Sequence, residues 1–376
     1  MEITVLFYLT PVIYMLGAII HKTSVYALKD VFMAVICARI LYYDITHHHC
    51  FSKREVYFLF FMYLYIIVDS LIQFDDFLFW LFGIREMIIT PIMLIIIGQF
   101  LRNQEVDWLS FIKKALLFTL VLTVGYAVIF RYSAYGPSGR LRSFWDSEHE
   151  PGIISAMTII AWTISYRKRH EKKDGIILVM SIIFGSYCIL LTKSRSVMIG
   201  LFLALLCMYY RKISLKNVIL SATVIALTIF LYNNYSNLTG RRILHNLAAR
   251  ENQYIMAFKL ISNYPIFGIG IDKYGAIAGR SKAFFFANSG TVTMDSTLLK
   301  YTVNLGLVFT VCFFALLFRV YKHGKKMEND AFPLVIFSLG IGAVTSKLGA
   351  YPINQYLFTY IGYVLLRIGK RYMRSR

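Results

Sequence analysis

Apolar residues in this chain come in blocks of about 15 to 25, each separated from the next by a short polar stretch. A block of that length crosses a hydrocarbon layer of roughly 30 Å as an α-helix. Hydrophobic residues occupy 58% of the 376 positions and charged residues 16%, whereas about a quarter of the residues in a soluble domain are charged. The sequence therefore predicts an all-α polytopic membrane protein, with one integral membrane domain over residues 1–376.

Twelve transmembrane spans are predicted from these blocks. They lie at residues 3–20, 25–43, 55–74, 77–101, 109–130, 151–166, 176–192, 197–210, 218–232, 298–320, 331–349 and 352–368. Lys and Arg cluster on alternate loops, as they do on the cytoplasmic side of a membrane. This pattern predicts that both termini are cytoplasmic. The first span lacks a basic leader and a cleavage site, so we expect a retained helix.

The net charge of +20 follows largely from these basic loops, so it does not indicate a nucleic-acid partner. The five cysteines form no spaced framework, which indicates neither a disulfide scaffold nor a zinc site. His47, His48 and His49 are consecutive, and consecutive side chains do not converge on one ion as an i, i+4 pair does. We therefore expect no metal site.

One long outward-facing loop is predicted at residues 233–297. An amphipathic helix is predicted within it, from 242 to 263, because apolar and polar residues alternate there with helical spacing. The apolar stripe contains Leu244, Leu247, Tyr254, Phe258 and Ile261, and the polar stripe contains Arg242, Asn246, Arg250 and Gln253. Pro265 ends this helix, and the glycines that follow predict a turn back toward the bilayer.

Charge in the long loop opposes the positive-inside tendency. The loop holds seven basic and three acidic residues, a balance of +4. One explanation is a solvated surface, or a patch for anionic lipid heads. The other is a site for a phosphorylated ligand at the outer leaflet, because guanidinium groups match phosphate oxygens with two hydrogen bonds.

Lys193 and Arg195 lie in a short outward turn between the seventh and eighth predicted spans. A charge so close to hydrocarbon is costly without a partner. Arg195 is therefore a candidate functional residue. The alternative is that both side chains snorkel to the lipid headgroups.

A middle outward loop is predicted at residues 131–150. It combines cations, carboxylates, an imidazole and aromatic rings, a mixture that commonly holds sugars. Either His149 or Glu150 could act as a general base toward a hydroxyl group. The alternative is an interfacial anchor, with Phe144 and Trp145 in the aromatic belt of the membrane.

Three charged residues lie within predicted spans: Arg85 and Glu86 in the fourth, and Asp69 near the outer end of the third. Charges inside a helical bundle usually pair with one another. Adjacent residues on a helix diverge by about 100°. We therefore predict that Arg85 and Glu86 each pair with a residue of another helix.

Three segments between residues 193 and 310 resemble the O-antigen polymerase and ligase superfamily. They are Lys193-Ser-Arg195-Ser at the start of a span, Arg250-Glu-Asn-Gln-Tyr254 leading to Pro265-Ile-Phe-Gly268-Ile-Gly270, and Asp295-Ser-Thr-Leu298 with Asn304-Leu-Gly306. The resemblance implies a GT-C-like glycosyltransferase fold with about 12 transmembrane helices. It also implies action at the outer leaflet on glycans carried by undecaprenyl pyrophosphate, without a metal or a nucleotide sugar.

The resemblance implies roles for basic residues of the outer loops. Arg195 and Arg250 correspond to arginines that bind the pyrophosphate. Arg142 is a loose match to an arginine of the earlier outer loop. Arg242 and Lys193 are expected to add supporting positive charge.

The resemblance also bears on the general base. Ligases of the family place a histidine just before the span that follows the long loop, and this chain has Asp295 there. That difference favours a polymerase over a ligase. The candidate bases are Asp295, His149 and Glu150.

The resemblance thus implies a metal-independent, inverting glycosyltransferase of the bacterial inner membrane. We expect a polysaccharide polymerase that moves a growing glycan from undecaprenyl pyrophosphate to another lipid-linked repeat unit, with those repeat units and a chain-length regulator as partners. The nearest alternative is an O-antigen ligase. A more remote alternative is a flippase for lipid-linked oligosaccharides, for which an internal repeat is expected and none is evident.

Overall fold

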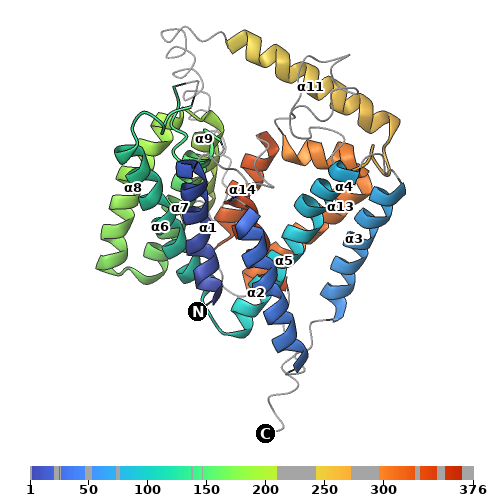
Figure 1. Ribbon diagram of the computed structural model, residues 1–376, viewed down its shortest axis with the longest axis horizontal. Coiled ribbons are helices and arrows are strands. Elements are labelled where there is room, and N and C mark those ends of the chain that lie inside the picture. The colour runs from blue at the N-terminus through green and yellow to red at the C-terminus, as the bar shows by residue number, and fades with distance from the viewer. Residues whose placement is uncertain are drawn as a thin grey trace.

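The computed structural model of the 376-residue chain is a bundle of helices (Figure 1). The structure describes residues 2–20, 25, 27–46, 53–72, 77–136, 139–145, 147–209, 243–271, 296–326, 331–344 and 352–365. Within these ranges the chain forms helices and connecting loops, with one isolated β-bridge between Tyr135 and Leu141. The predicted all-α class is confirmed.

The described helices follow the predicted spans closely. They are α1 (Glu2–Ile20), α2 (Ala27–Thr46), α3 (Lys53–Ile72), α4 (Phe77–Ile84), the π-helical turn η2 (Arg85–Ile89), α5 (Thr90–Asn103), α6 (Trp108–Ile129), α7 (Glu150–Arg169), α8 (Lys172–Thr192), α9 (Arg195–Tyr209), α11 (Ile243–Asn263), α13 (Thr297–Lys326), α14 (Phe332–Val344) and α15 (Ile353–Leu365). The predicted span 77–101 is divided among α4, η2 and α5. The predicted span 218–232 lies outside the described residues.

Several of these helices are suited to lipid. In the described part of the chain, five are long and apolar enough to cross a membrane, and three shorter ones are also apolar. Large apolar side chains such as Ile129, Val311 and Phe318 are exposed on them, as expected where a helix faces lipid and satisfies its own backbone hydrogen bonds. The chain is an all-α polytopic membrane protein.

Helix α7 lies at the centre of one group of helices, in contact with α6, α8, α9 and α14. All of its residues from Glu150 to Ser165 are buried. Glycines allow the close packing, since a Cβ atom on Gly152 would lie 2.8 Å from Oγ1 of Thr192. Small residues at such contacts let membrane helices approach each other closely.

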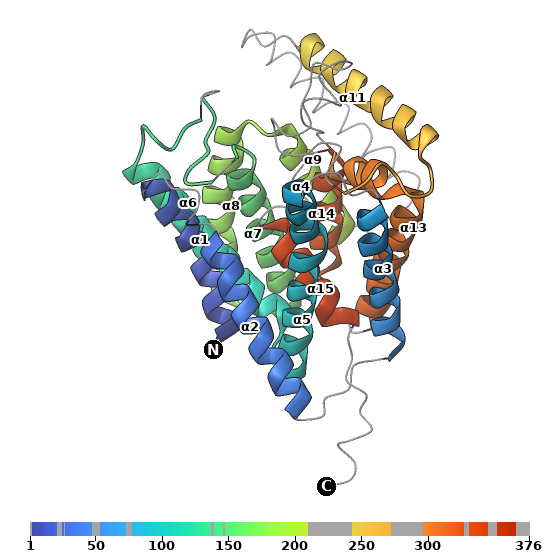
Figure 2. The ribbon, with the colours of Figure 1, turned by 45° about the vertical axis from the view of Figure 1, so that its right-hand side comes forward.

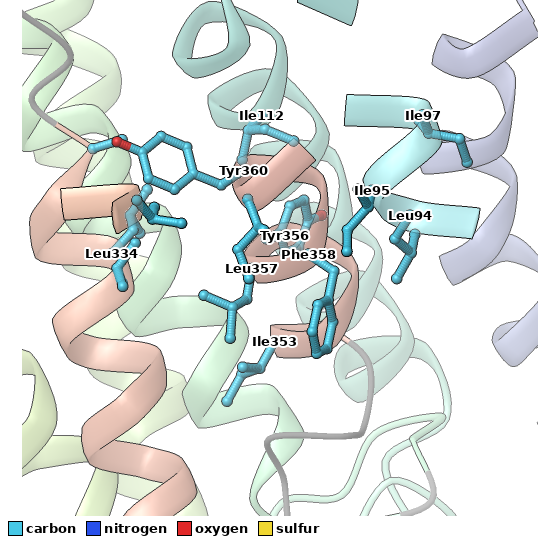
Figure 3. Close-up of a cluster of buried hydrophobic side chains, with 14 of the residues drawn as sticks. Leu94, Ile95, Ile97, Ile112, Leu334, Ile353, Tyr356, Leu357, Phe358 and Tyr360 are labelled. Atoms are coloured by element: carbon cyan, nitrogen blue, oxygen red, sulfur yellow. The ribbon is translucent and has the colours of Figure 1, made fainter. Parts of the chain in front are cut away.

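Helix α15 occupies the centre of the other group and packs along α5. Figure 3 shows its buried side chains beside Leu94 of α5. The two backbones nearly touch at two glycines. A Cβ atom on Gly98 would lie 1.9 Å from the Thr359 carbonyl oxygen, and one on Gly362 would lie 2.0 Å from the Ile95 carbonyl oxygen.

A buried polar network joins α6, α7 and α8. Lys113 belongs to one of the basic clusters that the sequence places on cytoplasmic loops, yet it is 3% exposed. Its Nζ lies 3.0 Å from Oδ2 of Asp174 and 2.6 Å from Oγ of Ser165. The ammonium group also lies 4.3 Å from the ring centroid of Trp162. This lysine is therefore a packing element of the bundle as well as a charge at a helix end.

Helix α13 is broken near its start by Gly306, whose φ of 76° is left-handed. A break of this kind leaves backbone groups without helical partners, and such groups need others in apolar surroundings. The turn after α11 supplies them. The Ile269 amide donates to the Val303 carbonyl and the Gly270 amide to the Asn304 carbonyl, both at 3.0 Å, and the Leu307 amide donates to the Pro265 carbonyl at 2.8 Å.

Close approach at two glycines completes this contact, which we call the glycine junction (residues 264–271 with 303–307). A Cβ atom on Gly306 would lie 1.9 Å from the Ile266 carbonyl oxygen, and one on Gly268 would lie 2.5 Å from the Val303 carbonyl oxygen. The Tyr65 hydroxyl of α3 lies 3.0 Å from the carbonyl oxygens of both Ile266 and Leu305, and its one hydrogen is shared between them. Three segments distant in sequence are thus joined at one point.

We predict that Gly306→Ala destabilises the protein by about 2 kcal/mol or more, because an L-residue resists this φ and its Cβ meets backbone. The control is Gly125→Ala in α6, where a Cβ would meet nothing within 4 Å. There a helical alanine should be neutral or mildly stabilising. Thermal unfolding in detergent measures both variants. Equal midpoints for the two would contradict this account of the junction.

Candidate functional site

The described parts of the predicted outward loops lie at one end of the bundle (Figure 2). Figure 2 shows the loop after α6, the connection from α8 to α9, and α11 at the same end, with the start of α1 at the other. Figure 1 shows the same arrangement of α11 and the start of α1. The candidate residues can therefore act on one side of a membrane.

The turn between α8 and α9 presents two cations. Lys193 ends α8 in the left-handed conformation, with φ of 49°, and its amide donates to the Leu190 carbonyl at 3.1 Å. Arg195 is the first residue of α9. Both residues are exposed, whereas Ser194 between them is 2% exposed. The amino end of a helix carries partial positive charge, so the turn suits an anionic ligand.

The middle loop lies directly against this turn. The Leu141 amide donates to the Leu191 carbonyl at 3.1 Å. Nδ1 of His149 lies 3.1 Å from Oγ of Ser194, which in turn lies 3.2 Å from Oγ of Ser196. Two segments that the sequence predicts as separate candidates therefore form one site. The imidazole of His149 contacts Ser194, which directly precedes Arg195 in the chain.

Two aromatic residues hold the middle loop in place. Phe144 and Trp145 are each 1% exposed and stack with ring centroids 4.5 Å apart. Nε1 of Trp145 donates to Oγ1 of Thr123 at 3.1 Å, and Oγ of Ser143 donates to the Thr123 carbonyl at 2.9 Å. These rings are buried in protein, so they are not interfacial anchors in the aromatic belt.

The two candidate bases of the middle loop have different surroundings. Glu150 is 5% exposed, and its Oε2 accepts a hydrogen bond from the Ser147 amide at 3.2 Å. This bond supports the first turn of α7. His149 is only partly buried and is the one that contacts the α8–α9 turn. Of the two, the imidazole is better placed to meet a ligand.

Arg142 is oriented toward its own loop. Its Nε donates to the Trp145 carbonyl at 2.6 Å, and its side chain is partly buried. Nearby, Nε of Arg140 lies 3.8 Å from Oε2 of Glu148. Arg142 thus helps to fix the loop that carries His149.

The long loop is described in part. Arg250 lies on α11, whereas Arg242 and Asp295 lie outside the described residues. Helix α11 packs on the glycine junction and α13 through a small cluster that contains Ala257, Leu260, Ile269 and Val303.

The buried face of α11 differs in part from the predicted apolar stripe. Gln253, from the predicted polar stripe, is 8% exposed, and Phe258, from the apolar stripe, is 60% exposed. The reason is that the non-local glycine junction selects which face is covered.

Two ion pairs occur where the π-helical turn interrupts the fourth predicted span. Arg85 pairs with Asp30 of α2. Oε2 of Glu86 lies 3.7 Å from Nζ of Lys300 on α13. The prediction that adjacent charges find partners on other helices is confirmed.

Sequence reasoning overlooked Lys300 and Ser194. Lys300 stands inside the predicted span 298–320, so the rule that charges within spans are functional or paired could have identified it. Ser194 lies within the motif Lys193-Ser-Arg195-Ser, but its role comes from a contact with His149, 45 residues earlier, which the motif does not show.

The described ranges offer no cluster of metal ligands. No group of three or more His, Cys, Asp and Glu side chains there could hold a metal ion. The consecutive residues His47, His48 and His49 lie outside those ranges.

Comparison with known proteins identifies one segment. Residues 178–314 match the family model described as O-antigen ligase, and no curated protein matches the sequence. The matched segment contains the α8–α9 turn, α11, the glycine junction and Lys300. Residues 178–314 therefore form a domain of the O-antigen polymerase and ligase superfamily.

Proposed function

We propose that this protein is a polysaccharide polymerase of the bacterial inner membrane, with both termini cytoplasmic. It transfers a growing glycan from undecaprenyl pyrophosphate to another lipid-linked repeat unit at the outer face of the membrane. The observation that carries the proposal is the contact of His149 with Ser194 beside Arg195. This contact brings a proton acceptor to a cationic turn that lies within the family segment.

The chemistry of transfer requires both groups. The acceptor hydroxyl oxygen forms a bond to the anomeric carbon as the bond from that carbon to the pyrophosphate oxygen breaks. The pyrophosphate leaves with the electron pair, and Arg195, with Lys193 and the start of α9, stabilises the charge that develops on it. His149 takes the hydroxyl proton. A displacement in one step inverts the anomeric centre.

Arg250, Arg242 and Asp295 remain proposals from the sequence. Arg250 would join Arg195 at the pyrophosphate, and Arg242 would add charge to the same end of the protein. Asp295 is the alternative to His149 and Glu150 as base. A chain-length regulator is proposed as a partner because the length of the polymer that a polymerase makes has to be limited.

An O-antigen ligase is the second candidate function, because the matching family model carries that description. Both enzymes break the same bond to pyrophosphate, so the arginine turn suits either. Asp295, in the place where ligases of the family have a histidine, favours the polymerase. A flippase for lipid-linked oligosaccharides would form no new glycosidic bond.

The product distinguishes these functions. We expect proteoliposomes with purified lipid-linked repeats to yield a ladder of glycans on undecaprenyl pyrophosphate. A single capped product on a different acceptor would indicate a ligase. Movement of the substrate across the bilayer without a new glycosidic bond would indicate a flippase.

We predict that Arg195→Ala lowers kcat for polymerisation on the order of 100-fold, since removal of one group that stabilises a developing oxyanion has this effect. Arg195→Lys should restore little, because an ammonium group cannot bind two phosphate oxygens at once as a guanidinium does. Arg131→Ala is the matched control, as Arg131 is an exposed arginine of the loop after α6. The rate of chain growth, followed on gels, is compared for Arg195→Ala, Arg195→Lys and Arg131→Ala. Normal ladders from Arg195→Ala would reject the proposed role.

We predict that Ser194→Ala lowers kcat about tenfold with little change in KM, because the imidazole loses the hydrogen bond that orients it. Ser133→Ala is the control. The Ser133 hydroxyl is exposed in the same loop and bonds only locally, to the Phe130 carbonyl at 3.3 Å. An unaltered kcat in Ser194→Ala would leave His149 without a positioning partner and would count against it as the base.

A further inference from the structure

The fourth predicted span is interrupted by the π-helical turn η2, and two charged residues lie in it, Arg85 and Glu86. Turns of this type inside helices frequently occur at functional sites. Neither residue belongs to the segment that matches the family. Any role of this turn is therefore one that the family segment does not supply.

The two ion pairs at this turn differ in kind. Arg85 donates a hydrogen bond to Asp30. The carboxylate of Glu86 lies 3.7 Å from Nζ of Lys300, which is beyond hydrogen-bond distance. Among the residues that the structure describes, no donor is hydrogen-bonded to Glu86. Lys300 thus holds the carboxylate by charge while leaving its lone pairs for other donors.

The exposure of the pair points to a ligand. The Lys300 side chain is 9% exposed and the Glu86 side chain 37% exposed. A carboxylate accepts about four hydrogen bonds, and a charge directed at lipid is expensive. A bound molecule that carries hydroxyl groups would satisfy this carboxylate without adding a second charge.

The residues that follow the pair in the chain line a small apolar crevice. An apolar crevice is lined by Met62 and Tyr63 of α3, Met87 of η2, and Tyr301 and Phe309 of α13, among others. Met87 and Tyr301 directly follow Glu86 and Lys300 in the chain. The crevice has a volume of about 20 Å³, near the space that a single water molecule needs, so the carboxylate and not the crevice would contact a sugar.

We propose that the Glu86 carboxylate, held by Lys300, binds hydroxyl groups of the sugar on the lipid-linked acceptor. The inference rests on the proposed polymerase function and assigns its acceptor to the helices that precede the family segment. Arg195 then serves the donor, and Glu86 the acceptor. Glu86 acts in binding, and the proton of the attacking hydroxyl still goes to the base described above.

The test separates donor from acceptor, which in a polymerase are chemically alike. The full chain is reconstituted in proteoliposomes with saturating lipid-linked repeats as donor. An alkyl glycoside of the same repeat unit, which lacks pyrophosphate, serves as an acceptor that cannot donate. We expect Glu86→Gln to raise KM for this acceptor on the order of 10- to 100-fold, with kcat within about twofold, because hydrogen bonds to a charged group are lost.

Asp30→Asn is the matched control, since it breaks the other ion pair at the same π-helical turn. We expect it to leave KM for the acceptor unchanged. Where Glu86→Gln folds poorly, as judged by size-exclusion chromatography, the double variant Glu86→Gln with Lys300→Met removes both charges together. It should show the same rise in KM, because no uncompensated ammonium group remains.

The outcomes distinguish the inference from the function beneath it. An active enzyme whose KM for the acceptor is unchanged in Glu86→Gln, or in the double variant, overturns the acceptor site and leaves the polymerase intact. Equal rises in Glu86→Gln and Asp30→Asn also overturn it, because distortion of the turn then explains both. A wild-type protein that forms no glycosidic bond rejects the polymerase and this inference together.

Discussion

Backbone hydrogen bonds at the glycine junction fix the outer end of this protein. The break at Gly306 removes helical partners from carbonyl groups of α13, and the turn after α11 replaces them. In an apolar environment an unpaired backbone group costs several kcal/mol, so the turn and the break require each other. The hydroxyl of Tyr65 extends this requirement to α3. The position of α11, and of Arg250 on it, depends on this one contact.

A second contact at the outer end of the bundle joins two parts of the chain that have different roles in the proposed reaction. Thr123 of α6 holds Trp145, and the loop so fixed carries His149 to Ser194. The residues before the family segment thus contribute the imidazole, while the segment itself contributes Arg195. The same division recurs at Glu86 and Lys300. A reaction between two lipid-linked glycans can use both halves of the bundle in this way.

The sequence predicts the helices of this fold well, because most of them are apolar over a length that can cross a hydrocarbon layer. It predicts contacts less well. Lys113 is a basic residue at the start of the predicted span 109–130, and its burial depends on Asp174, 61 residues later. The face of α11 was misjudged at Gln253 and Phe258 because the surface that covers it is non-local. Asp295, proposed from a motif, and Arg242, proposed from the charge of its loop, lie outside the described residues.

The burial of α7 inverts the usual relation between hydropathy and position in a membrane protein. Its residues from Glu150 to Ser165 meet protein on every side, yet α7 is not among the helices that length and composition mark as membrane spans. These side chains of α7 therefore contact neighbouring helices and not lipid. For such a helix the tolerated substitutions are set by volume and hydrogen bonding, so its sequence should drift in hydropathy while keeping its small residues in place.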